Sequence, residues 1–285
     1  MLKTLLVASV VAGASLAATV TTSAAAAANV VVAKDGSGNY TSVQAGINAV
    51  SAGGTISIKP GTYREVITVP SGKTGITMRG TTGKAADVVI DYNNASGTKK
   101  PDGSTYGTSG SATATIAANG FTATALTFRN SFDRNAHPDI TGTQAVAVKT
   151  TGDRMVFDNV TFLGHQDTLY ADTAAVGTVG RQYYRNCAIS GDVDFIFGRA
   201  TAVFDRATIT ALDRGSSSNN GFLTAASTRR SNPYGFLITG SKVVSSAANE
   251  SFYLGRPWHP SGDVDAIAQV LIRETSLPAR YFCAV

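Results

Sequence analysis

The sequence predicts an all-β fold in which short strands stack as successive coils, the architecture of a parallel β-helix. Short β-branched runs recur along the 285-residue chain, with Gly, Asn, Asp or Ser between them and no sustained 3.6-residue periodicity. Charged residues make up only 15% of the chain while glycine contributes 29 residues, which argues against a helical protein. Several runs also share one pattern and recur at an interval typical of solenoids.

One short N-terminal helix is predicted over Ser42–Ser51. Val43, Ile47 and Val50 share one side of it, and Thr41 or the first residue of the range is suited to cap it. Strands are predicted over residues 55–59, 66–69, 75–80, 87–90, 113–118, 123–130, 145–150, 155–162, 182–189, 202–209, 235–243 and 268–273.

The repeated pattern is apolar, polar, Asn/Asp/Gly, small, β-branched. It occurs in ATALTFRN, MVFDNVTF, YYRNCAISG, VFDRATIT and FLITGSKVV, at intervals of about two to three dozen residues. Strands at this period fit coils that bury their inner faces on their neighbours. A β-sandwich is the alternative, but its hairpins would show more Asn-Gly and Asp-Gly turns. Two long non-repetitive segments, Asn93–Ser111 and Ala211–Ser231, are predicted to be loops on the coils, where function usually lies.

Residues 1–28 are predicted to be a secretory signal peptide, and residues 29–285 to be one domain. Lys3 supplies the positive start, Leu5–Val11 an apolar stretch, and Ser23–Ala28 small residues suited to cleavage. The apolar stretch is too short for a membrane anchor, so we expect an exported, soluble protein. The formal net charge of +5 would attract a polyanion, or would only aid solubility.

Cysteine and histidine usage argues against a metal site. The two cysteines, Cys187 and Cys283, lie far apart, and none of the three histidines has ligand spacing with either. We expect Cys187 to be a buried thiol. A serine esterase is also disfavoured, because the chain has no G-x-S-x-G.

Five short strings carry polar residues that packing alone does not require. GTYRE, QAVAV, GHQDTLY, GDVDFIFG and LGRPW occur in this order between Gly61 and Trp258. The last four supply three aspartates, two glutamines, one arginine and one tryptophan, which suits attack on a carbonyl in an anionic carbohydrate. An inward carboxylate in VDFIF costs on the order of several kcal/mol unless it is paired, and Arg256 is a candidate partner.

Together the five strings resemble the motif series of the pectin methylesterase (pectinesterase) family, over Ala33–Ala279. The resemblance implies a right-handed, single-stranded parallel β-helix that hydrolyses methyl esters of galacturonate units in pectin, releasing methanol and pectate. It implies catalysis by aspartates, with no serine, metal or other cofactor. Pectin is then the expected partner, with no nucleic acid. Nothing in the sequence requires an oligomer, so we expect a monomer.

The resemblance also implies residue roles. Asp194 in GDVDFIFG matches the nucleophile, and Asp167 in GHQDTLY matches the general acid that protonates methoxide and then activates water. Gln144 and Gln166 match the amide donors of an oxyanion hole. Arg256 in LGRPW would hold Asp194 ionised and oriented through paired hydrogen bonds. For Gln144 or Asp167 taken alone, a coil-edge residue and a turn cap are the simpler interpretations.

Substrate contacts are expected from Gln144, Arg256 and two further residues. Trp258 is predicted to present its face to a sugar ring, with a core tryptophan as the alternative. Thr113, in the GSAT string, matches a substrate-binding position of the family. His165 is predicted either to line the cleft or to lie in a solvated loop.

Other functions stay open at this point. A polysaccharide lyase or a glycoside hydrolase could use the same fold on the same polymer, and Asp192, close to Asp194, leaves the hydrolase possible. A non-catalytic wall-binding solenoid would need none of the five strings. Tyr63 and Glu65 of GTYRE occur too early to place in the cleft, and we interpret them as structural.

Two departures from the family pattern bear on stability. After Ala279 the tail is unlike that of the family, and a solenoid end without a cap is expected to weaken the protein. Ala207 stands where related chains often carry a cysteine partner for Cys187. That disulfide therefore cannot form, and a bond from Cys187 to Cys283 is only a remote alternative.

Overall fold

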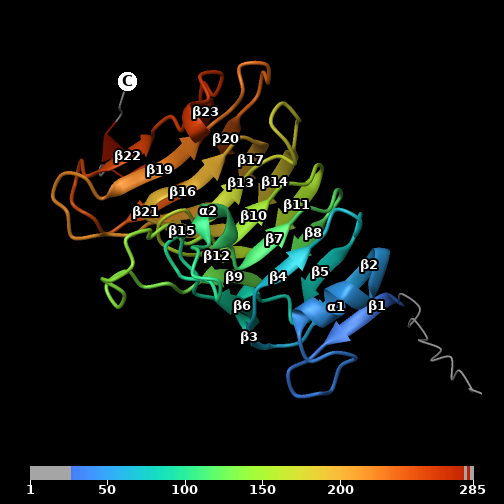
Figure 1. Ribbon diagram of the computed structural model, residues 1–285. Coiled ribbons are helices and arrows are strands. Elements are labelled where there is room, and N and C mark those ends of the chain that lie inside the picture. Colours follow the sequence, from blue (N-terminus) through green and yellow to red (C-terminus); the bar gives the residue numbers. More distant parts are fainter. Residues whose placement is uncertain (1–26, 279–280, 283–285) are drawn as a thin grey trace, which may run out of the picture.

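The strands stack as coils around one long axis. The computed structural model describes residues 27–278 and 281–282, and in this part of the chain the strands form three parallel sheets (Figure 1). Within a sheet, a strand generally pairs with the one three positions later in the chain, as β5 does with β8 and β8 with β11. Each coil therefore adds one strand to every sheet. The fold is the predicted right-handed parallel β-helix.

The nine-stranded sheet consists of β1 (Ala27–Val32), β2 (Val50–Ile58), β5 (Thr77–Gly80), β8 (Thr122–Thr124), β11 (Met155–Asp158), β14 (Arg181–Arg185), β17 (Thr201–Asp205), β20 (Phe236–Thr239) and β23 (Val270–Arg273). The eight-stranded sheet consists of β4 (Ile67–Val69), β7 (Ala114–Ile116), β10 (Val148–Thr150), β13 (Leu169–Ala171), β16 (Val193–Gly198), β19 (Gly221–Ala226), β22 (Phe252–Gly255) and β24 (Tyr281–Phe282). The seven-stranded sheet consists of β3 (Gly61–Arg64), β6 (Val88–Tyr92), β9 (Thr127–Asn130), β12 (Thr161–Leu163), β15 (Ala188–Gly191), β18 (Thr208–Ala211) and β21 (Lys242–Ser245). The helical segments are α1 (Val43–Ala49), α2 (Gly107–Gly110), η1 (Ala85–Asp87) and η2 (Pro260–Gly262).

The repeated sequence pattern marks a corner of the coil. Each of the five repeated runs, such as 155–162, is two strands of different sheets joined at a residue with positive φ, so the prediction of one strand is wrong for these runs. The corner residues are Ala125 (φ 53°), Asn159 (54°), Asn186 (54°), Arg206 (51°) and Gly240 (56°). This left-handed conformation bends the chain within one residue, and Asn and Gly adopt it at low cost.

Aromatic rings fill the interior of the middle coils. Phe157, Tyr184 and Phe204 are paired in register on β11, β14 and β17 and are fully buried. Their ring centroids lie 4.8 Å apart in both pairs, with interplanar angles of 6° and 11°. The Tyr184 hydroxyl donates to Oε1 of Gln182 at 2.7 Å, which satisfies its polar end. Each buried ring contributes about 1.5–3 kcal/mol, so the coils are held together by aligned apolar side chains.

The helix α1 lies within the range predicted for it. It ends two residues early because Val50 begins β2. The Ser42 hydroxyl accepts a hydrogen bond from the N–H of Ala45 at 3.3 Å and so caps the helix. The Glu65 carboxylate accepts from the first two helical N–H groups at 2.7 and 2.9 Å. Glu65 is therefore structural, as predicted, because it satisfies donors that the helix leaves free.

Two further sequence interpretations concern buried groups. Tyr63 is buried and its hydroxyl donates to the Lys59 carbonyl at 2.9 Å, a structural role. Cys187 is a buried free thiol, as predicted, and burial raises its pKa to about 12. Ala207 is buried as well, while Cys283 lies outside the described residues.

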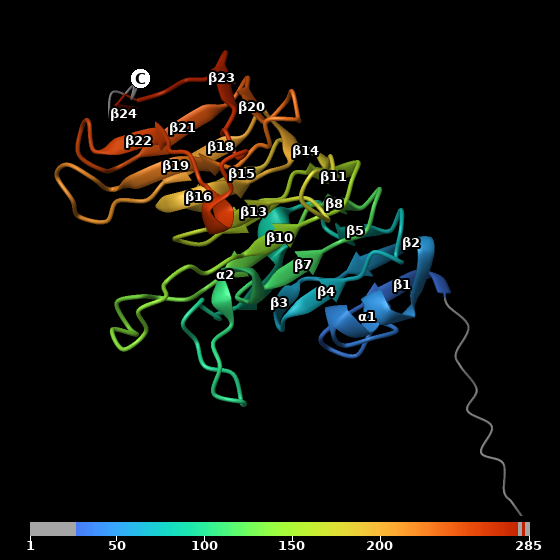
Figure 2. The same cartoon turned by 45° about the horizontal axis from the view of Figure 1, so that its top comes forward.

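Long segments leave the coils mainly between the seven-stranded and eight-stranded sheets. They cover residues 93–113, which include α2, together with 131–147 and 212–220, and Figure 2 shows loops near α2 projecting from the stack. The predicted loop Ala211–Ser231 is wrong in its second half, because Gly221–Ala226 form β19. Within the described part of the chain, no helix combines the length and apolarity needed to cross a membrane. The predicted signal peptide lies almost entirely outside the described residues.

Candidate active site

Adjacent coils bring five predicted site residues to the outer face of the eight-stranded sheet. The backbone N–H that follows Gln144 donates to the carbonyl of Gln166 at 3.0 Å. The N–H of Asp167 donates to the carbonyl that precedes Asp194 at 3.0 Å, and the N–H of Arg256 donates to β19 at 3.0 Å. The hydrogen bonds that stack the coils therefore join segments about 20 to 30 residues apart and bring all five residues to one face.

A cavity of about 220 Å³ opens on this face. Its lining residues are Thr108, Gln144, Gln166, Asp167, Asp194, Phe197, Ala225, Arg256 and Trp258. Six of the seven predicted site residues are in that set. Two larger hollows beside β23, of about 510 and 440 Å³, are lined by one charged side chain, Arg256, and by no carboxylate. The smaller cavity therefore has the groups that acid–base and nucleophilic chemistry requires.

A β-bulge turns Asp194 outward. Between two pairing positions β16 has one residue more than β19, and Asp194 lies in this bulge with φ 53°. Phe195 next to it is fully buried, so the strand is anchored while the carboxylate stays at the surface. Gly198, which ends the GDVDFIFG string, has φ 118°, and a Cβ there would lie 2.1 Å from the Ala171 carbonyl oxygen. The glycine therefore permits the close approach of β13.

Arg256 grips Asp194 through two hydrogen bonds. Its Nε donates to Oδ1 at 2.8 Å and its Nη2 to Oδ2 at 2.5 Å. The aspartate side chain is 14% exposed and the arginine side chain 46% exposed. The hydrogen bond to Asp194 raises the pKa of Arg256 above its ordinary value. A paired guanidinium favours the ionised form of a carboxylate, which is the form a nucleophile needs.

Asp167 lies in a different electrostatic setting. It is 7% exposed, and its backbone is left-handed with φ 67°. Burial, followed by the negative charge of Asp194, raises the pKa of Asp167 well above its usual range, and Arg256 only partly offsets this. Asp167 therefore favours its protonated form more than an ordinary aspartate does, while Asp194 is bonded to a guanidinium, an arrangement suited to separating an acid from a nucleophile.

A neighbouring hydroxyl orients the amide of Gln166. Thr143 Oγ1 donates to Oε1 of Gln166 at 2.8 Å, which leaves the amide N–H groups free to donate elsewhere. The carbonyl of Gln144 accepts from the N–H of Ser96 at 2.7 Å, which ties that segment to the 93–113 loop. Thr143 was missed by the sequence analysis, although it directly precedes QAVAV.

Trp258 both packs and lines the cavity. Tyr170 and Phe197 stack with centroids 4.3 Å apart, and Trp258 meets them edge-on at 5.8 and 5.5 Å. Trp258 is partly buried, and its backbone N–H donates to the carbonyl of Ala226 at 3.0 Å. Trp258 therefore packs on a small apolar cluster and also lines the cavity, and its contact with a sugar ring stays a prediction.

Comparisons with known proteins agree with this architecture. A family model described as Pectinesterase matches residues 29–274. A pectinesterase of Ralstonia nicotianae is 39% identical over 279 residues, which cover 88% of this chain and 70% of that protein. This chain belongs to the pectinesterase family. It is therefore a carboxylic ester hydrolase by family.

Solved structures of the family have the same fold. The pectin methylesterase from Erwinia chrysanthemi superposes with a TM-score of 0.81 at 36% identity, over 88% of this chain and 79% of its own. A pectin methylesterase crystallised in complex with a hexasaccharide matches with the same TM-score, identity and coverage.

Thr113 does not reach the cavity in this pectinesterase fold. Its side chain is buried and donates to the Arg129 carbonyl at 2.9 Å. Thr108, in α2, lines the cavity instead. Phe197 also lines the cavity and was not predicted to do so. In a regular strand, a residue three positions after the outward-facing Asp194 would face inward, but the bulge in β16 turns Phe197 outward.

Asp192 bonds Arg134 and His165 rather than a group beside Asp194. It is 1% exposed and lies with His165 in a separate cavity of about 190 Å³. Arg134 Nη2 lies 2.5 Å and His165 Nδ1 3.2 Å from its Oδ2. Burial opposes ionisation there, but these hydrogen bonds keep the pKa of Asp192 below its usual value. Asp192 is therefore poorly suited to act as a glycosidase acid. Within the described ranges, no group of three or more His, Cys, Asp or Glu side chains is placed to hold a metal ion.

Proposed function

We propose that this enzyme hydrolyses methyl esters of galacturonate units in pectin, releasing methanol and pectate. One observation carries the proposal. A single cavity combines an arginine-paired carboxylate, a carboxyl whose raised pKa favours its protonated form, and two amide side chains. The names of the family and of its relatives support pectin as the substrate, and the hexasaccharide complex of one structural neighbour supports a polymer-sized ligand.

The proposed reaction has two steps. A carboxylate oxygen of Asp194 attacks the ester carbonyl carbon and forms a bond to it, and the π electron pair of the C=O bond moves onto the carbonyl oxygen. That oxyanion collapses, the bond to the methoxy oxygen breaks, and Asp167 gives its proton to this oxygen, so methanol leaves and an anhydride joins Asp194 to the sugar. Water then attacks the sugar carbonyl, the ionised Asp167 takes its proton, and Asp194 departs as a carboxylate. The product acid loses its proton to solvent.

In this proposal Gln144 and Gln166 donate to the developing oxyanion. Gln166→Ala is expected to lower kcat about 10²–10³-fold, the usual loss for one oxyanion donor. Methanol release from esterified pectin measures it. Gln44→Ala is the matched control, because that amide bonds Asn48 and the Thr68 backbone on the outside of the fold and should leave the rate unchanged. A Gln166→Ala enzyme working at the parent rate would remove this residue from the mechanism.

Highly esterified pectin separates this function from its alternatives. We expect the enzyme to release methanol and to create neither unsaturated nor new reducing ends. All three products are measured in one incubation. Unsaturated ends would instead indicate a lyase, reducing ends a glycoside hydrolase, and the absence of every product a binding solenoid.

We also propose that the enzyme is exported and acts as a monomer on pectin. The apolar, small-residue N-terminal sequence supports export. The formal net charge, +5 for the full chain and +4 without Lys3 of the predicted signal peptide, favours encounter with a polyanionic substrate.

A further inference from the structure

Arg256 has a contact that its ion pair does not require. The guanidinium carbon lies 4.4 Å from the centroid of the Phe222 ring. This distance is well within the range of a cation–π interaction. The arginine side chain is 46% exposed, so few other atoms restrict its rotamers. A long, exposed side chain loses much conformational freedom when it is held in one geometry.

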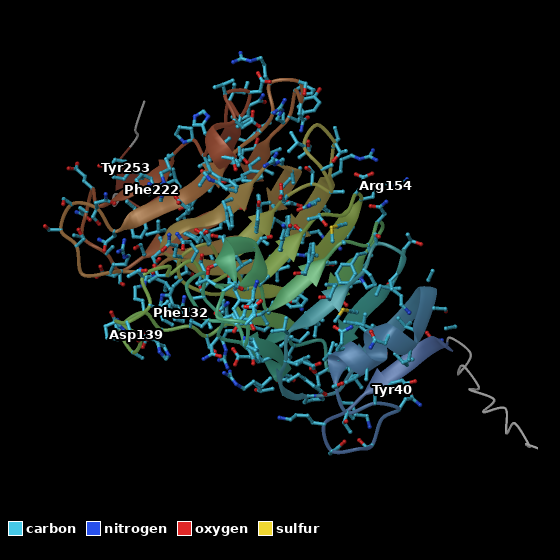
Figure 3. The ribbon with its side chains drawn as sticks, viewed as in Figure 1. Tyr40, Phe132, Asp139, Arg154, Phe222 and Tyr253 are labelled. Carbon is cyan, nitrogen blue, oxygen red and sulfur yellow. The ribbon has the colours of Figure 1, made fainter. Side chains whose placement is uncertain are left out.

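The sheet register places Phe222 where it can support this side chain. Phe222 lies on β19 and pairs with Val193 of β16, the residue before Asp194. On its other side it pairs with Tyr253 of β22, and the two rings stack at 5.1 Å with an interplanar angle of 19°. Figure 3 shows the labelled Phe222 and Tyr253 next to each other at the same end of the stack. The ring under the guanidinium is therefore itself held by a neighbouring ring.

Stacking and ion pairing use different parts of a guanidinium. The flat face can lie on an aromatic ring while the N–H groups in its edge remain free to grip a carboxylate through two hydrogen bonds. In this chain the edge atoms Nε and Nη2 bond Asp194 while the ring of Phe222 lies against the guanidinium. Phe222 is not one of the residues that line the 220 Å³ cavity. Its position therefore fits support of Arg256 better than contact with a substrate held there.

We propose that Phe222 is a positioning residue, which holds the Arg256 guanidinium flat against its ring so that the guanidinium edge faces Asp194. The inference rests on the proposed function, because it assumes that Asp194 is the nucleophile. Phe222 acts through Arg256 and makes no bond in the reaction. An aromatic ring is required at this position, and apolar volume alone does not suffice.

Kinetics of two Phe222 variants test the proposal. Phe222→Leu keeps apolar volume and removes the π face, and a cation–π contact corresponds to a factor of about 2 to 30 in rate. We expect kcat to fall by that factor with KM within about twofold of the parent, because Phe222 itself does not line the cavity. Phe222→Tyr keeps an aromatic ring at this position and should therefore have the kcat of the parent. Tyr234→Leu is the matched control, since that ring is 70% exposed and should leave kcat unchanged.

A measurement without substrate separates this proposal from the proposed function. Ring current from Phe222 should shift the Arg256 Nε–H resonance upfield in the parent and in Phe222→Tyr, and Phe222→Leu should return it toward the ordinary position. Arg256→Lys identifies the resonance. An unshifted parent resonance overturns the positioning role even if methanol release is normal. Parent-like kcat in Phe222→Leu, a loss confined to KM, or a Tyr variant as slow as Leu also overturns it. Failure of the parent to release methanol would count against the proposed function alone.

Discussion

Asp194→Asn should lower kcat on methyl-esterified pectin by at least about 10⁴-fold, the scale seen when a covalent nucleophile is removed from a hydrolase. An amide cannot supply the anionic oxygen that attacks the ester, although it keeps the size and shape of the side chain. The melting temperature should change little, because the pair with Arg256 is partly exposed and such pairs contribute at most about 1 kcal/mol. Methanol release and thermal melting of the same preparation measure both effects.

A second arginine-paired aspartate provides the control for this prediction. Asp153 accepts from Arg181 Nε at 2.9 Å and from Nη2 at 2.6 Å, nearly the geometry of Asp194 with Arg256. It lies outside the cavity, so Asp153→Asn removes the same kind of ion pair without touching the site. Asp153→Asn should keep the parent rate. Methanol release at the parent rate by Asp194→Asn would refute the nucleophile assignment.

Asp167→Asn should lower kcat about 10²–10⁴-fold, the usual contribution of a general acid. It should also make the folded protein more stable near neutral pH. Because burial raises the pKa of Asp167 in the folded state, the unfolded chain ionises this group first as pH rises. Its contribution to stability is therefore full below the unfolded pKa of about 3.9 and is lost as pH rises through the folded pKa. An asparagine at this position does not ionise, so the variant does not lose this stability as pH rises.

Melting temperatures of parent and Asp167→Asn over a pH series measure this effect. The two proteins should melt together below about pH 3.9, and the variant should melt higher as pH increases. The difference between the two curves isolates this group from other titrating carboxylates. A difference that does not depend on pH, or a less stable variant near neutrality, would contradict the buried, protonated carboxyl. A variant that keeps parent turnover would contradict its role as the acid.

Much of the coil architecture is predictable from local sequence, including β4, β7 and β10 of the sheet that carries the site, but the later strands of that sheet are not. The runs around Asn159 and Asn186 alternate clearly and reveal both the strands and the corner residue. The strands β13, β16, β19 and β22 escaped prediction, because β16, β19 and β22 contain glycine or aspartate and β13 has only three residues, which follow the polar residues 165–168. Polar residues and glycines in and beside these strands weaken the apolar alternation that a strand normally shows in the sequence.

The candidate site divides in a similar way. Asp194, Arg256 and their neighbours in the strings could be assembled from motif order, because coil stacking brings successive strings to one face. Thr108 lines the cavity in place of Thr113 because of the path of the 93–113 loop. The sequence of this loop does not follow the coil repeat, so its path could not be predicted. The orientation of Phe197 depends on a bulge of one extra residue, and strand periodicity does not reveal its position.

The bonding between coils has a consequence for how this chemistry can change. The proposed acid and the proposed nucleophile lie on consecutive coils, and the N–H of Asp167 donates to the carbonyl just before Asp194 at 3.0 Å. The ladder spacing of parallel strands, about 4.8 Å, therefore sets how far apart the backbones of these two residues stand. Repacking side chains cannot alter that separation. Substrate specificity can instead change through the loops between coils, because their lengths can vary while the spacing between the backbones of Asp167 and Asp194 stays constant.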